Sequence, residues 1–347
     1  MSKKYIVLKG YAGLGNRISA LVTAILYAKL SGRTLVVDWR DGFYSSDGSN
    51  VFDALFQIQN IPTAAPFDRA DSVAPKIWQN RLNLNLPDFL AKEAPSIRQT
   101  GQRMFMKYSI NIGKLTYPQD CLIYCSYVEE ISQLKRYLTR DLAHLKRAAN
   151  EAIFAEVFTT HLKLAPAINR YVTDFISAHF TKQPVIGFHV RHTDKPISLS
   201  RYRRAFKEHL EKYPNAIFFL ATDNRAVEQQ FLAEYPQKIV VTEKWLPEDG
   251  SKAHGNQNCP SLAQHAVESL IDIVLLSRCD RLIYSRTTSF AQIARMVSLT
   301  LSSDRCFDIQ TYEDQRHRSW QERRSSMSQA LQRRIQKLQA VSKMLRP

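Results

Sequence analysis

The sequence predicts an α/β protein made of two Rossmann-like halves that face each other across a cleft. Its 347 residues exceed the usual length of about 100–200 residues per domain, which favours two domains. Short apolar strand patterns alternate with helical patterns, most clearly after residue 165. Such alternation is typical of parallel sheets that are covered by helices.

The first half opens with a β–turn–α–β unit and is predicted to form an α/β domain over 1–164. The elements of this unit fall at 5–9 (strand), 10–16 (glycine turn), 17–30 (helix) and 34–39 (strand). Weaker patterns follow, and they predict a short helix at 86–95, a strand at 121–127 and mostly helix over 128–156.

The glycine turn reads GYAGLGN and contains Gly10, Gly13 and Gly15. It departs from GxGxxG and no P-loop lysine follows, so a dinucleotide or Walker-type site has weak support. Glycine serves a tight turn and close contact with a ligand equally well. Both interpretations therefore stay open for Gly13 and Gly15.

The second half is predicted to form a Rossmann-like domain over 165–310, because its patterns alternate regularly. Helices are expected at 165–180, 199–212, 224–234 and 261–278, and strands at 184–190, 216–221, 237–241 and 281–285. Val185, Ile186 and Phe188 suit a strand that is buried on both faces. Ligands of such sheets bind beyond the carboxyl ends of the strands, so polar residues at these ends are candidate ligand contacts.

The composition argues against several classes of protein. With 44% hydrophobic and 23% charged residues the chain is typical of globular proteins, and it has no run of about 18 apolar residues to span a membrane. The apolar run Tyr5–Leu8 is too short for the core of a signal peptide, so we expect a cytoplasmic protein. Five scattered cysteines fit neither a disulfide framework nor a paired zinc motif, and we expect them to be buried.

Half of the net charge of +16 lies in the C-terminal tail, where residues 316–347 carry nine Arg or Lys residues and one acid. Apolar residues recur there every three or four positions, at Met327, Leu331, Ile335, Leu338, Val341 and Leu345. This pattern predicts a basic amphipathic helix within 311–347. The helix either docks on the body of the protein or contacts an anionic membrane, which would hold the protein on the inner membrane face.

Residues 185–195 read VIGFHVRHTDK, so that an apolar strand ends in polar side chains. His189 and Arg191 project from the same face because side chains alternate along a strand. The guanidinium fork of Arg191 matches a phosphate, which makes the two residues a candidate clamp for a nucleotide diphosphate. The alternative is a surface ion pair between Arg191 and Asp194.

Asp272 lies in the apolar helical segment SLIDIVLLS, where an unpaired carboxylate would be costly. A carboxylate that accepts two hydrogen bonds suits the adjacent N1–H and N2–H groups of guanine. The alternatives are a place on the solvent face of the helix and an ion pair with Arg278 or Arg281.

A strand runs directly into a helix over 284–296, through Arg286, Thr287, Thr288 and Ser289. Hydroxyl and backbone N–H groups at the start of a helix form an anion site, which favours phosphate binding over simple N-capping. The chain has no Asp-x-Asp, no zinc-ligand spacing and no GxSxG. We therefore expect Arg191, and no metal, to neutralise the charge of a leaving diphosphate.

Taken in this order, the motifs resemble those of the α-1,6-fucosyltransferases, most closely the bacterial nodulation fucosyltransferase NodZ and more distantly the animal enzymes that core-fucosylate N-glycans. The resemblance rests on GYAGLGNR, 31–44, VIGFHVRHTDK, FFLATDN, 268–280 and 286–295. It implies a GT-B-like fold and inverting, metal-independent transfer of L-fucose from GDP-fucose. The acceptor that it implies is a sugar hydroxyl, the 6-OH of a GlcNAc in an oligosaccharide or cell-surface glycan.

The same resemblance implies roles for single residues. Arg191 matches the arginine that grips the β-phosphate, and His189 and Asp272 match the pair that reads guanine. The candidate donor contacts are His189, Arg191, His192, Asp272, Thr287, Thr288, Ser289, Phe290, Gly13 and Gly15. Asp194 and Lys195 match a conserved Asp-Lys pair of the animal enzymes that NodZ itself lacks, and we expect both to be catalytic here. His192 stands where the animal enzymes have a second arginine.

The catalytic base stays open, because the glutamate that the animal enzymes place after the lysine has no counterpart in PISLSRYR (196–203). A carboxylate near the donor could deprotonate the acceptor hydroxyl. Asp194 is the first candidate, although it could equally orient Arg191. Asp38 and Asp41, on the acceptor side of the predicted cleft, are the second.

The expected partners are thus a GDP-sugar donor and an oligosaccharide or glycolipid acceptor, with no metal or other cofactor and no nucleic acid. Another GDP-hexose is the closest alternative donor, since contacts with guanine and phosphate do not distinguish one sugar from another. A polyanion-binding protein that acts through the basic tail is a weaker alternative, because the basic residues lack interleaved aromatic platforms.

Overall fold

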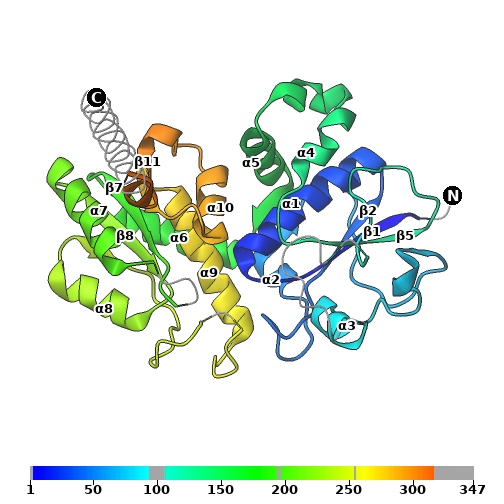
Figure 1. The fold of residues 1–347 in the computed structure, drawn as a ribbon, viewed down its shortest axis with the longest axis horizontal. Helices are drawn as coiled ribbons and strands as arrows, with labels where there is room; N and C mark the ends of the chain where they lie inside the picture. The colour runs from blue at the N-terminus through cyan, green and yellow to red at the C-terminus, as the bar shows by residue number, and fades with distance from the viewer. Residues whose placement is uncertain (1–2, 94–104, 106, 194–196, 254, 316–347) are drawn as a thin grey trace, which may run out of the picture.

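The computed structural model describes residues 3–93, 105, 107–193, 197–253 and 255–315. These residues form an α/β protein in which two parallel sheets, one in each half of the chain, lie on either side of a central group of helices (Figure 1). The predicted fold class, a GT-B-like arrangement of two Rossmann-like halves facing each other across a cleft, is confirmed.

The N-terminal sheet has the strand order β2-β1-β5-β4 and is parallel throughout. Its strands are β1 (Tyr5–Lys9), β2 (Thr34–Asp38), β4 (Val73–Ala74) and β5 (Cys121–Cys125). The crossover from β1 to β2 is α1 (Leu14–Ser31), which is buried along most of its length and is therefore apolar on nearly all faces. Lys9 pairs with Asp38 in the sheet register, so that the carboxyl ends of β1 and β2 lie side by side.

Shorter elements complete this half. The helices are α2 (Phe52–Leu55), α3 (Leu86–Glu93), α4 (Ile131–Leu134) and α5 (Asn150–His161), and β3 (Phe56–Ile58) pairs antiparallel with β6 (Leu162–Leu164). The predicted helix over 128–156 is interrupted, because 3-10 segments lie between α4 and α5 and Arg140 has a positive φ of 55°. The sequence did not indicate β3, β4 and β6, since two or three residues are too few to show alternation.

The C-terminal sheet has the order β11-β10-β7-β8-β9 and is also parallel. Its strands are β7 (Val185–Val190), β8 (Ile217–Thr222), β9 (Ile239–Val240), β10 (Arg281–Tyr284) and β11 (Cys306–Asp308). Its helices are α6 (Pro166–His179), α7 (Leu199–Lys212), α8 (Arg225–Glu234), α9 (Leu262–Ser277) and α10 (Ser289–Val297). The central strand, β7, is buried at every residue, as its largely apolar sequence predicts, and the buried residues include His189.

The two halves share one hydrophobic core, because α1 packs against α9 and α10 and α5 packs against α1 and α10. One close approach is at Gly15, in the first turn of α1. A Cβ atom there would lie 2.8 Å from the carbonyl carbon of Ser289 and 2.9 Å from the amide nitrogen of Phe290. Only glycine lets the starts of α1 and α10 come this close.

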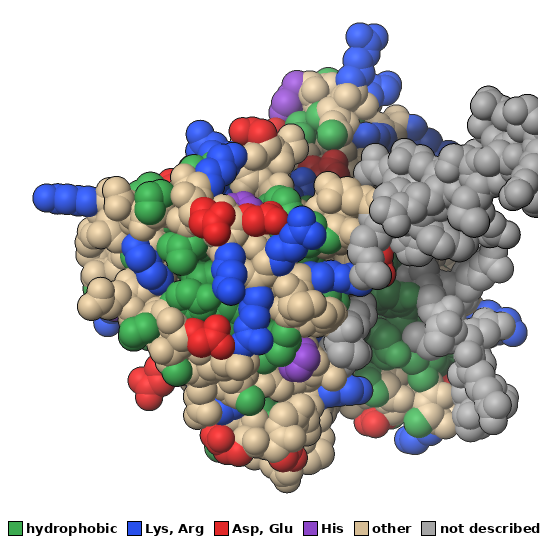
Figure 2. Space-filling model, turned by 60° about the vertical axis from the view of Figure 1, so that its left-hand side comes forward, with side chains coloured by type: hydrophobic (Ala, Val, Ile, Leu, Met, Phe, Trp, Pro, Cys, Tyr) green, Lys and Arg blue, Asp and Glu red, His purple; other side chains and the backbone are tan. Residues whose placement is uncertain are grey.

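Basic and acidic side chains are intermingled on the outer face of the C-terminal half, where α7 and α8 come forward (Figure 2). Arg201 pairs with Glu313 and Arg204 with Glu208, both at 2.9 Å between nitrogen and oxygen. Such exposed pairs add little stability, but they offset the charges of Arg201 and Arg204. On the part of this face that the structure describes, the charge pattern therefore does not favour a polyanion.

The remaining expectations concern cysteines, membranes and the tail. All five cysteines are free, and Cys121, Cys125 and Cys279 are buried, whereas Cys259 and Cys306 are only partly so. Within the described residues, no helix has both the length and the apolar character that a membrane crossing needs. Residues 311–315 are helical, and the rest of the predicted tail helix lies outside the described residues.

We predict that Gly15→Ala destabilises the protein, because the new methyl group must push the backbone of α10 away from α1. Overpacking of this kind costs about 1–3 kcal/mol in the free energy of unfolding, measured by urea denaturation. Gly42→Ala is the matched control, since a Cβ atom there meets no atom within 4 Å. Equal stability of the two variants would contradict the tight contact.

Candidate functional site

A pocket of about 560 Å³ lies between the two halves, at the carboxyl edges of both sheets. The N-terminal half contributes the turn after β1 and the start of α1. The C-terminal half contributes the ends of β7 and β8, one face of α9 and the start of α10. Doubly wound sheets bind ligands at this edge, and the volume suits a small molecule.

Two helix N-termini, those of α1 and α10, meet at the wall of this pocket. Gly13 and Thr288 occupy the N-cap positions, and neither caps its helix with a side-chain hydrogen bond. The first turns of both helices lack acidic residues, so no carboxylate within them offsets the positive end of either helix dipole. The Ser289 hydroxyl donates a hydrogen bond of 3.0 Å to Asn16 Oδ1 and ties the two helix starts together. Such paired helix starts favour an anionic ligand.

Arg191 follows β7 and lines the pocket. Its Nε atom lies 3.2 Å from Asp223 Oδ2. The strand register places Val190 beside Thr222, so the next charged residues, Arg191 and Asp223, lie at the same edge of the sheet. Asp223 also accepts a hydrogen bond of 2.8 Å from the backbone N–H of His192. The carboxylate therefore holds both the guanidinium of Arg191 and the start of the loop that follows it.

His189 is the buried neighbour of Arg191 in the pocket, with only 4% of its surface exposed. Its ring stacks on Phe290, with the ring centroids 5.1 Å apart. Burial, and then the charge of Arg191, lower the pKa of His189 to about 3. The ring is therefore neutral at physiological pH, and its Nδ1 atom has no hydrogen-bond partner among the described residues. A buried, unsatisfied nitrogen that borders a pocket suits a hydrogen bond with a ligand.

Asp272 borders the same pocket from the middle of α9 and is 3% exposed. The Thr242 hydroxyl donates a hydrogen bond of 2.6 Å to its Oδ1 atom. The Lys244 ammonium donates one of 2.8 Å to its Oδ2 atom. Asp272 is thus compensated by Thr242 and Lys244 rather than by Arg278 or Arg281, the partners considered from the sequence. Each oxygen of this carboxylate keeps the capacity to accept a further hydrogen bond.

The other predicted donor contacts are divided between the pocket and its surroundings. Gly13, Gly15, Thr288, Ser289 and Phe290 all line the pocket. Thr287 and His192 are not among the residues that border it; the Thr287 hydroxyl lies 2.9 Å from the Ser285 hydroxyl. Asp194 and Lys195 lie outside the described residues.

Arg286 does not lie where an anion-binding residue would, although the hydroxyl residues that follow it in the sequence suggested such a role. Its guanidinium pairs with Asp308 at 2.8 Å and with Asp314 at 3.0 Å, and nearly half of its side chain is exposed. It does not line the pocket. The start of α10 therefore offers its backbone and the side chains of Thr288 and Ser289 to a ligand, without this arginine.

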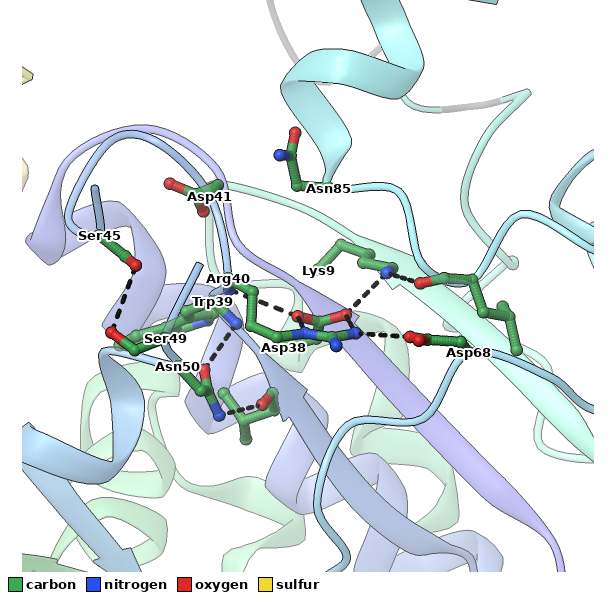
Figure 3. Close-up of polar contacts among 12 residues, drawn as sticks. Lys9, Asp38, Trp39, Arg40, Asp41, Ser45, Ser49, Asn50, Asp68 and Asn85 are labelled. Carbon is green, nitrogen blue, oxygen red and sulfur yellow. Dashed lines mark hydrogen bonds and ion pairs between the residues drawn. The ribbon is translucent and has the colours of Figure 1, made fainter. Parts of the chain in front are cut away.

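Asp38, one of the second-choice bases, is engaged by two cations (Figure 3). Its carboxylate accepts hydrogen bonds from Lys9 Nζ at 2.7 Å and from Arg40 Nε at 2.9 Å, and the figure shows both side chains converging on it. Burial alone would raise the pKa of Asp38, but the hydrogen bonds and charges of Arg40 and Lys9 lower it below its ordinary value. Asp38 does not line the pocket, and a carboxylate with a lowered pKa is a weak base.

Asp41, the other second-choice base, forms a buried bidentate pair with Arg17. The two bonds measure 2.8 Å and 2.9 Å, and the rings of Trp39, Phe43 and Tyr44 surround the guanidinium at 5.0–5.6 Å. Arg17, Phe43 and Tyr44 line the pocket, whereas Asp41 does not. Both oxygens of Asp41 are occupied by this pair, which gives the residue a structural role beneath the pocket.

Several polar residues of the pocket were not singled out from the sequence, among them Asp223, Lys244, His265 and Glu268. Asp223 had a signal, because it follows an apolar strand in the same way as Arg191 does. His265 and Glu268 share one face of α9 with Asp272, at spacings i, i+3 and i+7. This helical spacing is a signal that the sequence contains. Lys244 lies in a loop without a pattern, and only the tertiary structure brings it to Asp272.

Three basic side chains line the described part of the pocket, those of Arg17, Arg191 and Lys244. Each is paired with an aspartate. In the same described part of the chain, no group of three or more His, Cys, Asp or Glu side chains is placed to hold a metal ion. What the pocket presents to an anion is therefore a set of oriented cations and two helix starts.

Comparison with known proteins relates the chain to one family. The family described as "Nodulation protein Z (NodZ)" matches residues 141–328, which is more than half of the chain. The nodulation protein Z of Azorhizobium caulinodans is 24% identical over 320 residues, covering 83% of this chain and 87% of that protein. That of Bradyrhizobium diazoefficiens is 22% identical and covers 84% and 79%.

Solved structures agree on the fold. The crystal structure of NodZ α-1,6-fucosyltransferase soaked with GDP-fucose superposes with a TM-score of 0.57 at 21% identity, covering 85% of this chain and 93% of that one. POFUT1 in complex with GDP superposes with a TM-score of 0.50 at 11% identity, covering 89% and 98%. At these identities the similarity establishes the arrangement of the two sheets.

We predict that Asp41→Asn lowers the free energy of unfolding by about 3–5 kcal/mol, because it leaves the Arg17 charge buried without a counter-charge. Chemical denaturation measures this loss. Asp141→Asn is the control, since Asp141 forms an exposed pair with Lys29 and its loss should change stability little. A stable Asp41→Asn variant that has lost only turnover would instead mark Asp41 as a catalytic residue.

The lowered pKa of His189 leads us to a second prediction, which concerns how the stability of the protein depends on pH. Its ordinary pKa is 6.5 and its folded pKa is about 3, so the unfolded chain binds the proton more readily between these values. The wild type should therefore be fully stabilised above about pH 6.5 and lose stability as the pH falls towards 3. Between pH 7.5 and pH 5 it should lose about 2 kcal/mol more than His189→Gln does, measured by urea denaturation without nucleotide. Parallel pH profiles would contradict the buried, neutral ring.

Proposed function

The chain belongs to the nodulation protein Z (NodZ) family, and on that premise we propose that it transfers L-fucose from GDP-fucose to a sugar hydroxyl. The observation that carries the proposal is the presence of Arg191 and two helix N-termini in one pocket. Oriented guanidinium and backbone donors of this kind suit the diphosphate of a nucleotide sugar. The matched NodZ structure was soaked with GDP-fucose, and we carry this donor over to the present chain.

The polar groups of the pocket suggest how the donor lies. We place the diphosphate between Arg191 and the starts of α1 and α10, where Gly13, Gly15 and Ser289 line the pocket. The guanine base then lies against Asp272, whose carboxylate suits the N1–H and N2–H groups, with neutral His189 nearby. This placement uses Thr288 and Phe290 as walls and requires no metal ion.

The reaction that we propose is a single inverting displacement. The acceptor oxygen forms a bond to C1 of fucose while the bond between C1 and the β-phosphate oxygen breaks, and GDP leaves. Negative charge grows on the β-phosphate during this step, and Arg191 is placed to neutralise it. Asp223 keeps the guanidinium in position throughout, since their ion pair does not depend on the substrate. The hydroxyl proton passes to a base.

Asp194 is the carboxylate that we propose as this base, with Lys195 beside it. The carboxylates that line the described part of the pocket are already engaged: Asp223 with Arg191, Asp272 with Lys244, and Glu268 with the backbone N–H of Trp245. Asp38 and Asp41 are held in buried ion pairs away from the pocket. The loop directly after Arg191 is therefore the segment that we favour for the proton acceptor.

The same proposal assigns the acceptor and the part that each half of the chain plays in binding. We propose that residues 1–164 bind the acceptor, that residues 165–310 bind the donor, and that the 6-OH of a GlcNAc is the group that is fucosylated. Another GDP-hexose remains the alternative donor. The cytoplasmic location and the contact of residues 316–347 with an anionic membrane stay predictions.

We predict that Arg191→Ala and Arg191→Lys each lower kcat about 10²–10³-fold while the unfolding transition is retained. Lysine keeps the charge but loses the fork that both Asp223 and a phosphate require. The assay measures transfer from labelled GDP-fucose to oligosaccharides that end in GlcNAc, with linkage analysis of the product. Arg201→Ala is the control, because Arg201 lies on α7, pairs with Glu313 and does not line the pocket.

Three results of this assay would change the account. Near-normal turnover of both Arg191 variants would remove the proposed clamp. Loss of wild-type turnover in the presence of a chelator would show that a metal ion takes part. Preference for GDP-mannose or GDP-rhamnose over GDP-fucose would assign the chain to another GDP-hexose.

A further inference from the structure

We propose that Lys244 is a specificity-determining residue that recognises O6 of guanine, directly beside the carboxylate of Asp272. The inference rests on the proposed function, because it takes the base of a GDP-sugar as the ligand of this part of the pocket. It adds the Lys244 ammonium to the groups that recognise guanine. The same ammonium gives a reason why other purines are rejected.

The arrangement of polar atoms around Asp272 carries the inference. Thr242 donates to Oδ1 and Lys244 donates to Oδ2, so that hydroxyl, two carboxylate oxygens and ammonium follow one another in that order. Asp272 and Lys244 both line the pocket, whereas Thr242 does not. From the pocket a ligand therefore meets two acceptors followed by one donor.

Guanine presents the complementary order along one edge. Its N2–H and N1–H groups are donors, and its O6 atom is an acceptor. Only one alignment places every donor opposite an acceptor: N2–H on Oδ1, N1–H on Oδ2 and O6 on the Lys244 ammonium. An ammonium can serve both partners, because it has three donors and uses one of them on Asp272.

The structure holds Lys244 in place without any ligand. Its side chain is 5% exposed, and it lies between Asp272 at 2.8 Å and Glu228 at 3.7 Å. Glu228 in turn pairs with Arg225 at 2.8 Å, so that charges of alternating sign run from the outer surface to the pocket. Two carboxylates thus compensate the cost of burying the ammonium, and its position is fixed before a nucleotide binds.

The same row of atoms rejects adenine. Adenine places an amino group, a donor, where O6 stands in guanine, and an unprotonated N1 where N1–H stands. Its amino group would face the ammonium and its N1 would face the carboxylate, so both contacts would be unfavourable. Buried polar groups that are left without a partner give strong discrimination of this kind.

The test compares the affinity of the full-length protein for GDP, 6-thio-GDP and inosine diphosphate, by titration calorimetry. 6-Thio-GDP keeps both donors but replaces O6 with sulfur, a weaker acceptor, and the wild type should bind it about tenfold less tightly than GDP. Lys244→Met should bind both ligands more weakly and nearly equally, with a ratio below about twofold. Inosine diphosphate lacks only the N2 amino group, so its disadvantage against GDP should persist in Lys244→Met.

Thr242→Val is the matched control, because it removes a donor from Asp272 without touching O6. It should weaken both ligands by the same factor and keep the tenfold ratio between GDP and 6-thio-GDP. Lys244→Gln, whose amide is neutral and shorter, gives the same test if the methionine variant does not fold. A purely structural role of Lys244 would make its variants behave like Thr242→Val.

The outcomes separate this inference from the proposed function. A wild type that binds GDP and 6-thio-GDP equally, or a Lys244 variant that keeps the tenfold ratio, overturns the role of Lys244 and leaves the transferase proposal intact. A wild type that distinguishes GDP from 6-thio-GDP but not from inosine diphosphate overturns the alignment on Asp272. A wild type that does not bind GDP at all overturns the proposed function itself.

Discussion

The close contact between the starts of α1 and α10 is the constraint on which the pocket depends. It joins the two halves at the carboxyl edges of their sheets, and it brings two helix dipoles to the same wall. Gly15 makes the contact sterically possible, and the hydrogen bond from Ser289 to Asn16 fixes it. Because both helices follow parallel strands directly, two separate sheets direct their helix starts to one pocket, which we propose as the anion site.

Around this contact, the buried charges are held in pairs. One pair, Arg17 with Asp41, lies beneath the pocket. A second, Arg191 with Asp223, lies at the end of β7, and a third, Lys244 with Asp272, lies beside α9. A buried charge without a partner would be costly, so each pair fixes the position of its cation. These pairs would preorganise the pocket for the anionic ligand that we propose.

The sequence predicted most of the frame, because long elements such as α1, α9 and β7 have strong apolar periodicity. It also pointed to His189, Arg191, Asp272 and Ser289, since polar residues at strand ends or inside apolar helices are conspicuous. What it could not predict depends on tertiary contacts between residues far apart in the chain. Lys244 and Thr242 reach Asp272 from a loop, and no local pattern marks them.

Ion pairing also bears on candidates that residue type alone suggested. Asp38 and Asp41 lie close to the carboxyl end of β2, where a catalytic carboxylate is plausible from the sequence. The structure surrounds them with Lys9, Arg40 and Arg17, which turns them into structural charges. Arg286 likewise precedes a helix start that lines the pocket, but aspartates on the outer surface hold its guanidinium.

The most direct test of the central claim, that protein cations and helix ends hold the diphosphate, is a crystal structure of the protein with GDP bound. We expect β-phosphate oxygens in contact with the guanidinium of Arg191 and with backbone N–H groups at the starts of α1 and α10, with the Arg191–Asp223 pair retained. Phosphates bound elsewhere in the pocket, or bridged to the protein by a metal ion, would contradict it.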